Sequence, residues 1–437
     1  MNTAELSFKS VLIGLCLCTV THSANAKLIA WKDNIPSSLS PFQNNPEALA
    51  QLTQDKIMVF AHPTTKTYLP TLAKNQNPSV RFTTAAVILP VSAASVEKAI
   101  RDYEQYPKLY PTLKSAKVLE QDGAISQVRY KVSIPTPIPI LNFNETVVFQ
   151  HQMSQNSLAS IVIDAPIPYG LGKIEWFALD GNKTLVTLTQ WGDLDQAKGL
   201  LIRKIMQAIP EAKLGIPSGT NVFFMEALSQ HFKAVQKPLS LSQDALPEHT
   251  LTKSQIDLIV QLSQNAQHPV SFVHAPHRVS FAHGAENMRF VSTYQYYPQS
   301  PQQLQKWTQP QHYATLFPRQ VKSVKTTTLE NQSQDADFQV RMGLGVINIP
   351  FRFKLNFSFP TASSNRFYAN GGDLKLIKGQ TQFNPYAQGT LLKMTTTLKI
   401  DESAPFLIRA ARSLPYHDLL PTVGGNVVFA QKIKKIS

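Results

Sequence analysis

The chain repeats itself once over most of its length. Short segments recur in the same order, at an offset between 204 and 212 residues. The matched segments are 51–55 with 261–265, 106–111 with 313–318, 114–117 with 322–325, 128–129 with 340–341, 201–203 with 407–409, and 219–224 with 424–429. A period this long exceeds that of solenoid repeats, so it indicates two copies of one domain.

The boundary between the copies is expected where the repeated pattern is interrupted. Pro238, Pro247 and a polar stretch rich in Ser, Gln and Asp lie between the last match of the first copy and the first match of the second. Such composition is typical of a connection between domains. We therefore expect copy 1 to span residues 27–240 and copy 2 to span 241–437, each with an N-terminal extension.

Within copy 1, the hydrophobic pattern predicts an α+β fold. Residues 81–91 are strand-like, and residues 116–191 alternate between strands and turns, with Asp122-Gly123 and Asp180-Gly181-Asn182 favouring tight hairpins. After Trp191 the period becomes helical, and residues 218–235 form an amphipathic stretch. We expect a curved antiparallel sheet covered by a long C-terminal helix, with a space for a ligand between them.

One segment of copy 1 resembles a known superfamily. Asp102-x-x-x-Tyr106-Pro107-x-x-Tyr110-Pro111, between a first strand and a run of hairpins, is similar to the START-like (SRPBCC) helix-grip superfamily, including its polyketide-cyclase, coenzyme-Q-binding and lipid-transfer branches. The resemblance covers residues 81–235 and, more loosely, 287–437, where copy 2 lacks the Asp and the first Pro. It implies two helix-grip domains in tandem, each with a hydrophobic cavity and without a metal or other cofactor.

The first 26 residues are typical of a secretory signal peptide. A ten-residue apolar run, residues 11–20, precedes Ala24-Asn25-Ala26, which fits a signal-peptidase site. Both cysteines, Cys16 and Cys18, lie inside this segment. We therefore expect a mature chain without cysteine, exported to the periplasm of a Gram-negative-like cell.

The formal net charge of +14 is unevenly distributed. Residues 27–240 hold 21 Lys and Arg against 16 Asp and Glu, whereas residues 241–437 hold 20 against 11. Basic proteins attract nucleic acids or anionic membranes. Because the charges are scattered and the protein is expected to be exported, we favour an anionic membrane surface as partner over nucleic acid. Copy 2, at +9 against +5, is expected to be the membrane-facing half. The oligomeric state stays open.

Motifs of common enzymes are missing from the sequence. There is no Gly-rich phosphate loop, zinc-binding His-Glu helix or nucleophile elbow. Four histidines, His268, His274, His277 and His283, could ligate a metal, but two prolines separate them. We interpret them as loop histidines and expect no metal site and no catalytic residue.

Seven residues are candidates for contacting a ligand. The two arginines lie in predicted strands and could hold an anionic head group if they point inward, with Glu145 as a possible partner in copy 1. The aromatic residues could line the pocket or belong to the core. The candidates are Arg129, Phe143, Glu145, Trp176, Trp191, Phe223 and Arg341.

These features lead to one preferred function and two alternatives. The preferred one is binding or transfer of a hydrophobic, lipid-like ligand in the periplasm, with one cavity per domain. The first alternative is a cyclase or hydrolase acting on a hydrophobic substrate in the same cavity, which would need an acid–base pair such as Arg129 and Glu145. The second is an envelope scaffold with collapsed cavities. Catalysis is uncertain, and binding without catalysis is favoured.

Overall fold

The structure is a computed structural model. It describes residues 28–436 apart from 73–75, 135–142, 199–202, 204–205, 208, 235–236, 243–244, 282–283 and 345–346. The expected signal segment therefore lies outside the described residues. None of the helices in the described part of the chain is both long enough and apolar enough to span a membrane.

Copy 1 has the expected order of strands, short helices, hairpins and a long C-terminal helix. Its elements are α1 (Pro46–Thr53), β1 (Ile57–Ala61), β2 (Thr65–Lys66), β3 (Ser79–Val80), β4 (Thr83–Leu89), α2 (Ala93–Arg101), α3 (Tyr106–Leu109), β5 (Leu113–Asp122), β6 (Ile125–Ile134), β7 (Phe143–Ser154), β8 (Ser157–Asp164), β9 (Gly170–Leu179), β10 (Lys183–Gly192) and α5 (Ala212–His231).

Copy 2 repeats this order. The short strand β11 (Leu239–Ser240) lies at the boundary before it. The elements of copy 2 are α6 (Lys253–Ala266), β12 (Val270–Phe281), β13 (Gly284–Tyr297), α7 (Pro301–Leu304), α8 (Tyr313–Leu316), β14 (Val321–Thr328), β15 (Gln334–Leu344), β16 (Ile347–Thr361), β17 (Ser364–Gly372), β18 (Leu376–Tyr386), β19 (Gly389–Lys399), α9 (Phe406–Arg409) and α10 (Leu420–Ile436).

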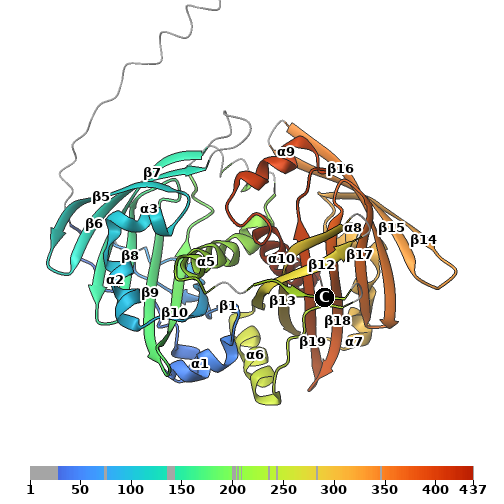
Figure 1. The fold of residues 1–437 in the computed structure, drawn as a ribbon, viewed down its shortest axis with the longest axis horizontal. Coiled ribbons are helices and arrows are strands. Elements are labelled where there is room, and N and C mark those ends of the chain that lie inside the picture. Colours follow the sequence, from blue (N-terminus) through green and yellow to red (C-terminus); the bar gives the residue numbers. More distant parts are fainter. Residues whose placement is uncertain are drawn as a thin grey trace, which may run out of the picture.

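The predicted α+β fold is confirmed, because each copy curves an antiparallel sheet around its C-terminal helix (Figure 1). The residues predicted to form tight hairpin turns lie in such turns. Gly123 has φ +54° between β5 and β6, and Gly181 and Asn182 have φ +70° and +58° between β9 and β10. Positive φ is readily accessible to Gly and Asn and closes tight hairpins.

The two sheets are joined into one 17-stranded sheet. β1 of copy 1 pairs with β12 of copy 2, antiparallel, so the strands form one continuous surface. Val59 lies opposite Ser271, and these two residues are equivalent at an offset of 212 residues. The two copies therefore meet about a local two-fold axis, with β5 and β14 as the outermost strands (Figure 1).

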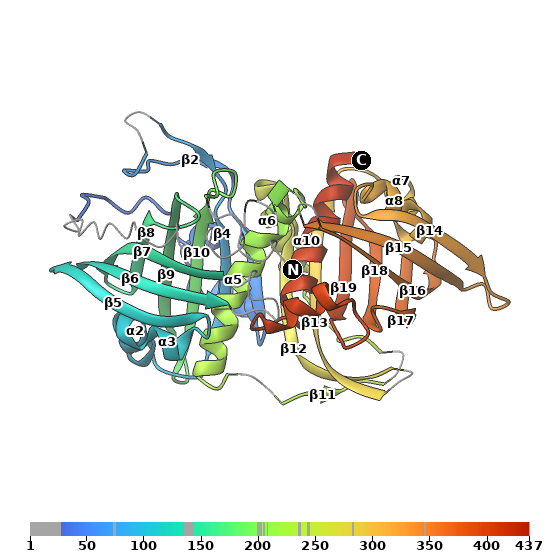
Figure 2. The same cartoon turned by 90° about the horizontal axis from the view of Figure 1, so that it is seen from above.

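The C-terminal helices α5 and α10 pack against each other at the centre of the molecule, on the concave side of the sheet (Figure 2). Each is anchored by an equivalent asparagine. Asn221 donates through Nδ2 to the carbonyl of Thr83 at 2.6 Å, and Asn426 donates to the carbonyl of Val291 at 3.2 Å. A buried amide that reaches the sheet backbone orients the helix across the sheet.

The N-terminal extension of copy 1, for which the sequence indicated no role, covers the convex face of its sheet. The backbone of Ile29 exchanges two hydrogen bonds of 2.7 Å with the amide of Gln150. Lys173 pairs with Asp33 at 3.1 Å, and Glu175 accepts a hydrogen bond from the backbone of Ser38 at 2.8 Å. These contacts supply partners for polar side chains that the strands would otherwise expose.

Candidate functional site: an apolar cavity in copy 1

A cavity of about 420 Å³ lies between the concave face of the copy 1 sheet and helix α5. Strands β5 to β10 supply most of its wall, because alternate residues of each strand point to this face. Ile216, Pro217, Thr220 and Phe224 contribute from α5. Its volume falls within the range of about 300–1,000 Å³ that holds small-molecule ligands.

The wall of this cavity is almost entirely apolar. Its described lining residues include no Lys, Arg, Asp or Glu. Tyr110, which follows α3, belongs to this wall. The aromatic and aliphatic members from the sheet include Leu113, Val132, Val147, Phe149, Leu158, Val162, Ile174 and Leu188. Such a surface favours burial of hydrocarbon, at about 25 cal/mol for each Å² removed from water.

One chain of hydrogen bonds interrupts the apolar wall. The Tyr130 hydroxyl lies 2.8 Å from His151 Nε2, and His151 Nδ1 lies 2.8 Å from the Ser160 hydroxyl. All three residues line the cavity. The tyrosine ring of Tyr103 stacks on the imidazole with ring centroids 4.9 Å apart, which holds the imidazole in place.

Burial keeps this chain uncharged. It lowers the pKa of His151 to about 3, and it raises the pKa of Tyr130 well above its ordinary value, with the neighbouring tyrosines adding to the effect. At neutral pH these three residues therefore present a neutral imidazole and two hydroxyl groups to the cavity. These can exchange hydrogen bonds with a neutral polar atom of a ligand, but they offer no ionic partner for a charged head group.

The structure places both candidate arginines outside the cavity. Arg129 and Arg341 are exposed. Arg129 lies on the face of β6 opposite to Val128 and Tyr130, which are buried in the concave core. The expectation that either arginine holds an anionic head group in the cavity is wrong, because strand alternation directs both side chains outward.

The remaining candidates have different environments. Trp191 belongs to the cavity wall and also packs on the cluster around Trp31 and Phe82. Trp176 is fully buried in the main core and is not among the lining residues. Phe223 packs on Phe224 and Tyr416 with centroids 5.7 and 5.4 Å away, and it is the next residue, Phe224, that lines the cavity.

The last two candidates, Glu145 and Phe143, lie on β7. Glu145 is half-buried and lies opposite Val132, yet it is not among the lining residues. The side chain of Phe143 lies outside the described residues. The proposed pair of Arg129 and Glu145 therefore does not form an acid–base site.

Tyr130, His151 and Ser160 were missed at the sequence level, although a signal for them existed. Val147, Phe149 and His151 alternate along one strand, as do Val128, Tyr130 and Val132 along its neighbour. A polar residue at the inward position of an apolar alternation is a candidate for a pocket. The choice of the adjacent Arg129 as a candidate selected the outward face of β6, whereas the cavity lies on the inward face.

Copy 2 has lost this polar chain. The strand pairing makes Phe338, Phe357 and Phe367 the counterparts of Tyr130, His151 and Ser160. Phe357, at the position of His151, has its ring centroid 6.4 Å from that of Phe338 and 5.5 Å from that of Phe367. Aromatic rings thus fill positions that shape the cavity in copy 1, so the expectation of one equal cavity in each domain needs correction.

Two of the four candidate metal-ligating histidines differ from expectation, because His274 and His277 lie buried within β12 rather than in loops. His268 lies in the connection between α6 and β12, as expected, and His283 lies outside the described residues. Among the residues that the structure describes, no group of three or more His, Cys, Asp or Glu side chains gathers in a way that could hold a metal.

Comparison with known proteins gives no match to a family model and none to a curated protein. Solved structures do match. The di-domain aromatase/cyclase StfQ of the steffimycin biosynthetic pathway is 11% identical and covers 81% of this chain and 98% of its own, with a TM-score of 0.24. The aromatase/cyclase Zhui from Streptomyces sp. R1128 is 20% identical over 35% of this chain and 93% of its own, with a TM-score of 0.29.

A third match is a STAR-related lipid transfer protein fragment from Xanthomonas axonopodis. It is 16% identical over 39% of this chain and 99% of its own, with a TM-score of 0.27. At these identities and scores, what the matched proteins do says nothing about the activity of this chain. The description of the fold rests on the order of helices and strands in this chain. The chain consists of two domains in tandem, each a curved antiparallel sheet around a C-terminal helix.

Proposed function

We propose that copy 1 binds a neutral, hydrophobic, lipid-like molecule in its cavity. The observation that carries the proposal is the cavity of about 420 Å³ whose described wall is mostly apolar, contains no Lys, Arg, Asp or Glu, and includes the uncharged hydrogen-bonded chain of Tyr130, His151 and Ser160. A ligand with a hydrocarbon body and one neutral polar atom matches this surface. Copy 2, whose equivalent positions hold packed aromatic rings, serves as a structural partner.

Uptake of a neutral fluorescent probe tests the proposal. Val147 is half-buried and lines the cavity, so Val147→Trp places an indole in the ligand's space. We expect this variant to lose Nile red binding by at least tenfold. Lys131→Trp, on an exposed site of the neighbouring strand, is the matched control and should bind as the unsubstituted protein does. Equal binding by both variants would contradict the proposal, provided circular dichroism shows both folded.

We also propose that the protein acts in the periplasm as a carrier between membranes. The support is the signal-like segment of residues 1–26 and the net positive charge of +14. N-terminal sequencing of the mature protein should begin at Lys27, and the protein should fractionate with the periplasm. A mature chain that retains Met1, or one found only in the cytoplasm, would contradict this part of the proposal.

The hydrogen-bonded chain favours a second candidate, an enzyme that transforms a hydrophobic substrate in the same cavity. A tyrosine hydroxyl linked to an imidazole can shuttle a proton at a ligand atom. His151→Phe, which introduces the residue of copy 2, separates the two functions. A binding protein should keep Nile red uptake and show no change in the bound molecule, whereas an enzyme should accumulate unconverted ligand.

A further inference from the structure

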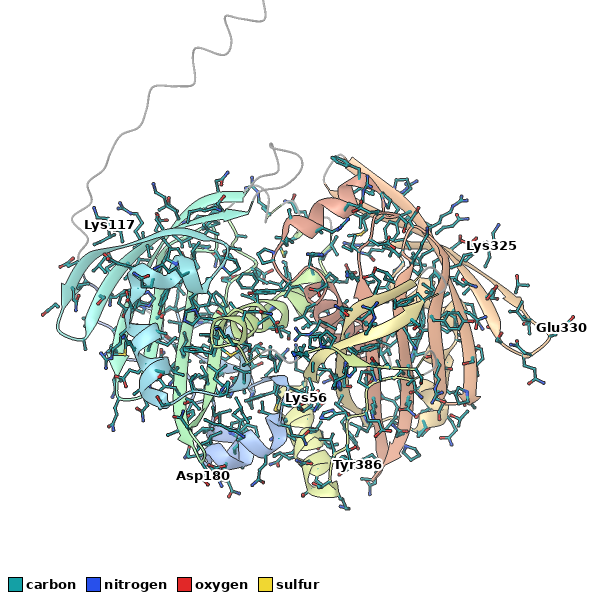
Figure 3. All side chains as sticks on the ribbon, viewed as in Figure 1. Lys56, Lys117, Asp180, Lys325, Glu330 and Tyr386 are labelled. Atoms are coloured by element: carbon teal, nitrogen blue, oxygen red, sulfur yellow. The ribbon has the colours of Figure 1, made fainter. Side chains whose placement is uncertain are left out.

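A second cavity, of about 530 Å³, lies in copy 1. Helix α2, the β5–β6 hairpin and the β7–β8 hairpin form its walls. Both hairpins turn at the same end of the sheet as the β9–β10 hairpin, whose Asp180 lies at the lower edge of the molecule in Figure 3. The apolar cavity extends towards the opposite end, where Pro166 and Ile167 of the β8–β9 connection line it. The two cavities therefore lie towards different ends of copy 1.

Two stacked rings separate these cavities. Tyr103 lines the second cavity, and its ring stacks on that of His151, which lines the apolar cavity, with centroids 4.9 Å apart. Ser126 and Met153 also line the second cavity, and like Tyr103 they are buried. Tyr103 and Met153 belong to the main core of copy 1. The second cavity therefore has a floor that packing holds in place, and it is separate from the apolar cavity.

The rim above this floor is polar. Amide and hydroxyl side chains converge on it from the two hairpins, namely Gln121, Ser154, Gln155 and Asn156. Within the part of the chain that the structure describes, none of these four side chains has a hydrogen-bond partner in the protein. Each amide or hydroxyl group can both donate and accept a hydrogen bond. The rim therefore offers donors and acceptors that the fold itself does not use.

The charges at this cavity cancel. Glu97 and Arg101 are the two charged residues among its described lining residues, and Arg101 Nε donates to Glu97 Oε1 at 2.7 Å. The terminal guanidinium nitrogens of Arg101 have no partner among the described residues, so they remain available as donors. A neutral ligand that is rich in hydroxyl groups matches this surface better than a charged one.

Copy 2 has different residues at the positions of the floor. The strand pairing makes Gln334 and Phe359 the counterparts of Ser126 and Met153. At an offset of 207 residues, Pro310 takes the place of Tyr103. The residues that form the floor are therefore specific to copy 1, and we expect one such site per chain.

We propose that the second cavity binds a neutral, polyhydroxylated molecule of the size of a mono- or disaccharide. Sugar hydroxyls both donate and accept, so the amide and hydroxyl side chains of the rim satisfy them without an ionic partner. Tyr103 and Met153 supply apolar area for the C–H groups of a sugar ring. The volume falls within the range of small-molecule sites. This site is independent of the ligand proposed for the apolar cavity.

Saturation-transfer difference NMR on the full mature protein tests the site, with glucose, N-acetylglucosamine, maltose and trehalose as probes. One variant, Gln121→Ala with Gln155→Ala, removes an amide from each hairpin. A second, Ser154→Trp, places an indole at the rim. The matched control, Gln261→Ala with Gln264→Ala, removes two amides from α6 of copy 2. All the substituted side chains are exposed, so each variant should fold, which circular dichroism checks.

We expect at least one of these sugars to bind, with an affinity that falls at least about tenfold in both cavity variants and is unchanged in the control, because only the cavity variants lose hydrogen bonds or space. Absence of binding by all four sugars, or equal affinity in the cavity variants and the control, would overturn the proposal. A sugar that displaces Nile red would also overturn it, because that sugar would occupy the apolar cavity. Nile red uptake should be the same in every variant, and its absence from the unsubstituted protein would count against the ligand of the apolar cavity rather than against this site.

Discussion

At the scale of single residues, the clearest sign of common ancestry is a buried polar chain present in both copies. His62 Nε2 lies 2.7 Å from the Thr84 hydroxyl, which lies 2.7 Å from that of Thr189. In copy 2, His274, Ser292 and Thr395 form the same chain with distances of 2.7 and 2.8 Å. The hydroxyl partners of each histidine lie on strands far apart in the sequence, so the sequence pattern could not predict these hydrogen bonds.

The buried histidine of this hydrogen-bonded group makes the free energy of unfolding of the protein depend on pH. Burial, together with the charge of Lys173, lowers the pKa of His62 from 6.5 to about 4. Below pH 6.5 the unfolded chain binds a proton that folded His62 does not, so the free energy of unfolding should fall between pH 6.5 and about 4. This one group should contribute a loss of about 3 kcal/mol.

Urea denaturation across this pH range measures the effect. His62→Gln keeps a polar partner for Thr84 but cannot titrate, so the variant should show a shallower dependence on pH. His231→Gln, at an exposed histidine, is the control and should keep the original slope. A slope that is unchanged in His62→Gln would contradict the buried neutral state of this histidine.

At the scale of elements, the strand and turn pattern was largely predictable, whereas the ends of the long helix were not. The apolar spacing predicted a helix over residues 218–235, and α5 spans Ala212–His231. Its first turns depend on a contact that no local pattern contains. Gly215 lies against the backbone of Gly424 of α10, so closely that a Cβ atom on Gly215 would be 2.7 Å from that residue's carbonyl oxygen.

The helix crossing therefore requires glycine at residue 215. Gly215→Val should force α5 and α10 apart and lower the free energy of unfolding by about 1–3 kcal/mol. Gly219→Ala, on the same helix with open space around the site, should raise it by about 0.5–1 kcal/mol, because alanine favours helix. Urea denaturation of both variants checks the pair. Similar effects of the same sign would contradict the close crossing.

At the scale of the whole molecule, the duplication predicted two domains but not how they join. The segments 27–80 and 241–286 had no assigned role, yet they contain β1 and β12, which pair with each other. An apolar strand pattern predicts a strand without identifying its partner, so the pairing of β1 with β12 could not be predicted from the sequence. A second link is the ion pair between Glu226 of α5 and Arg289 of β13, at 2.7 and 2.9 Å.

Because the sheet and this ion pair both cross the junction, the two copies should unfold together. Glu226 is only 2% exposed, and Glu226→Ala leaves the buried Arg289 charge without its partner. We expect a loss of about 3–5 kcal/mol that affects both copies. Trp176 reports on copy 1 and Trp307 on copy 2 in variants where the other tryptophans are replaced. Separate transitions for these two reporters would contradict a joint fold.

The central claim is that copy 1, and not copy 2, holds a neutral hydrophobic molecule. Native mass spectrometry of the protein purified from its own cell envelope tests it most directly. We predict one bound molecule per chain, released by organic solvent, uncharged at neutral pH, and absent from Val147→Trp. A chain that carries no ligand, or Val147→Trp that keeps the same ligand, would contradict the claim.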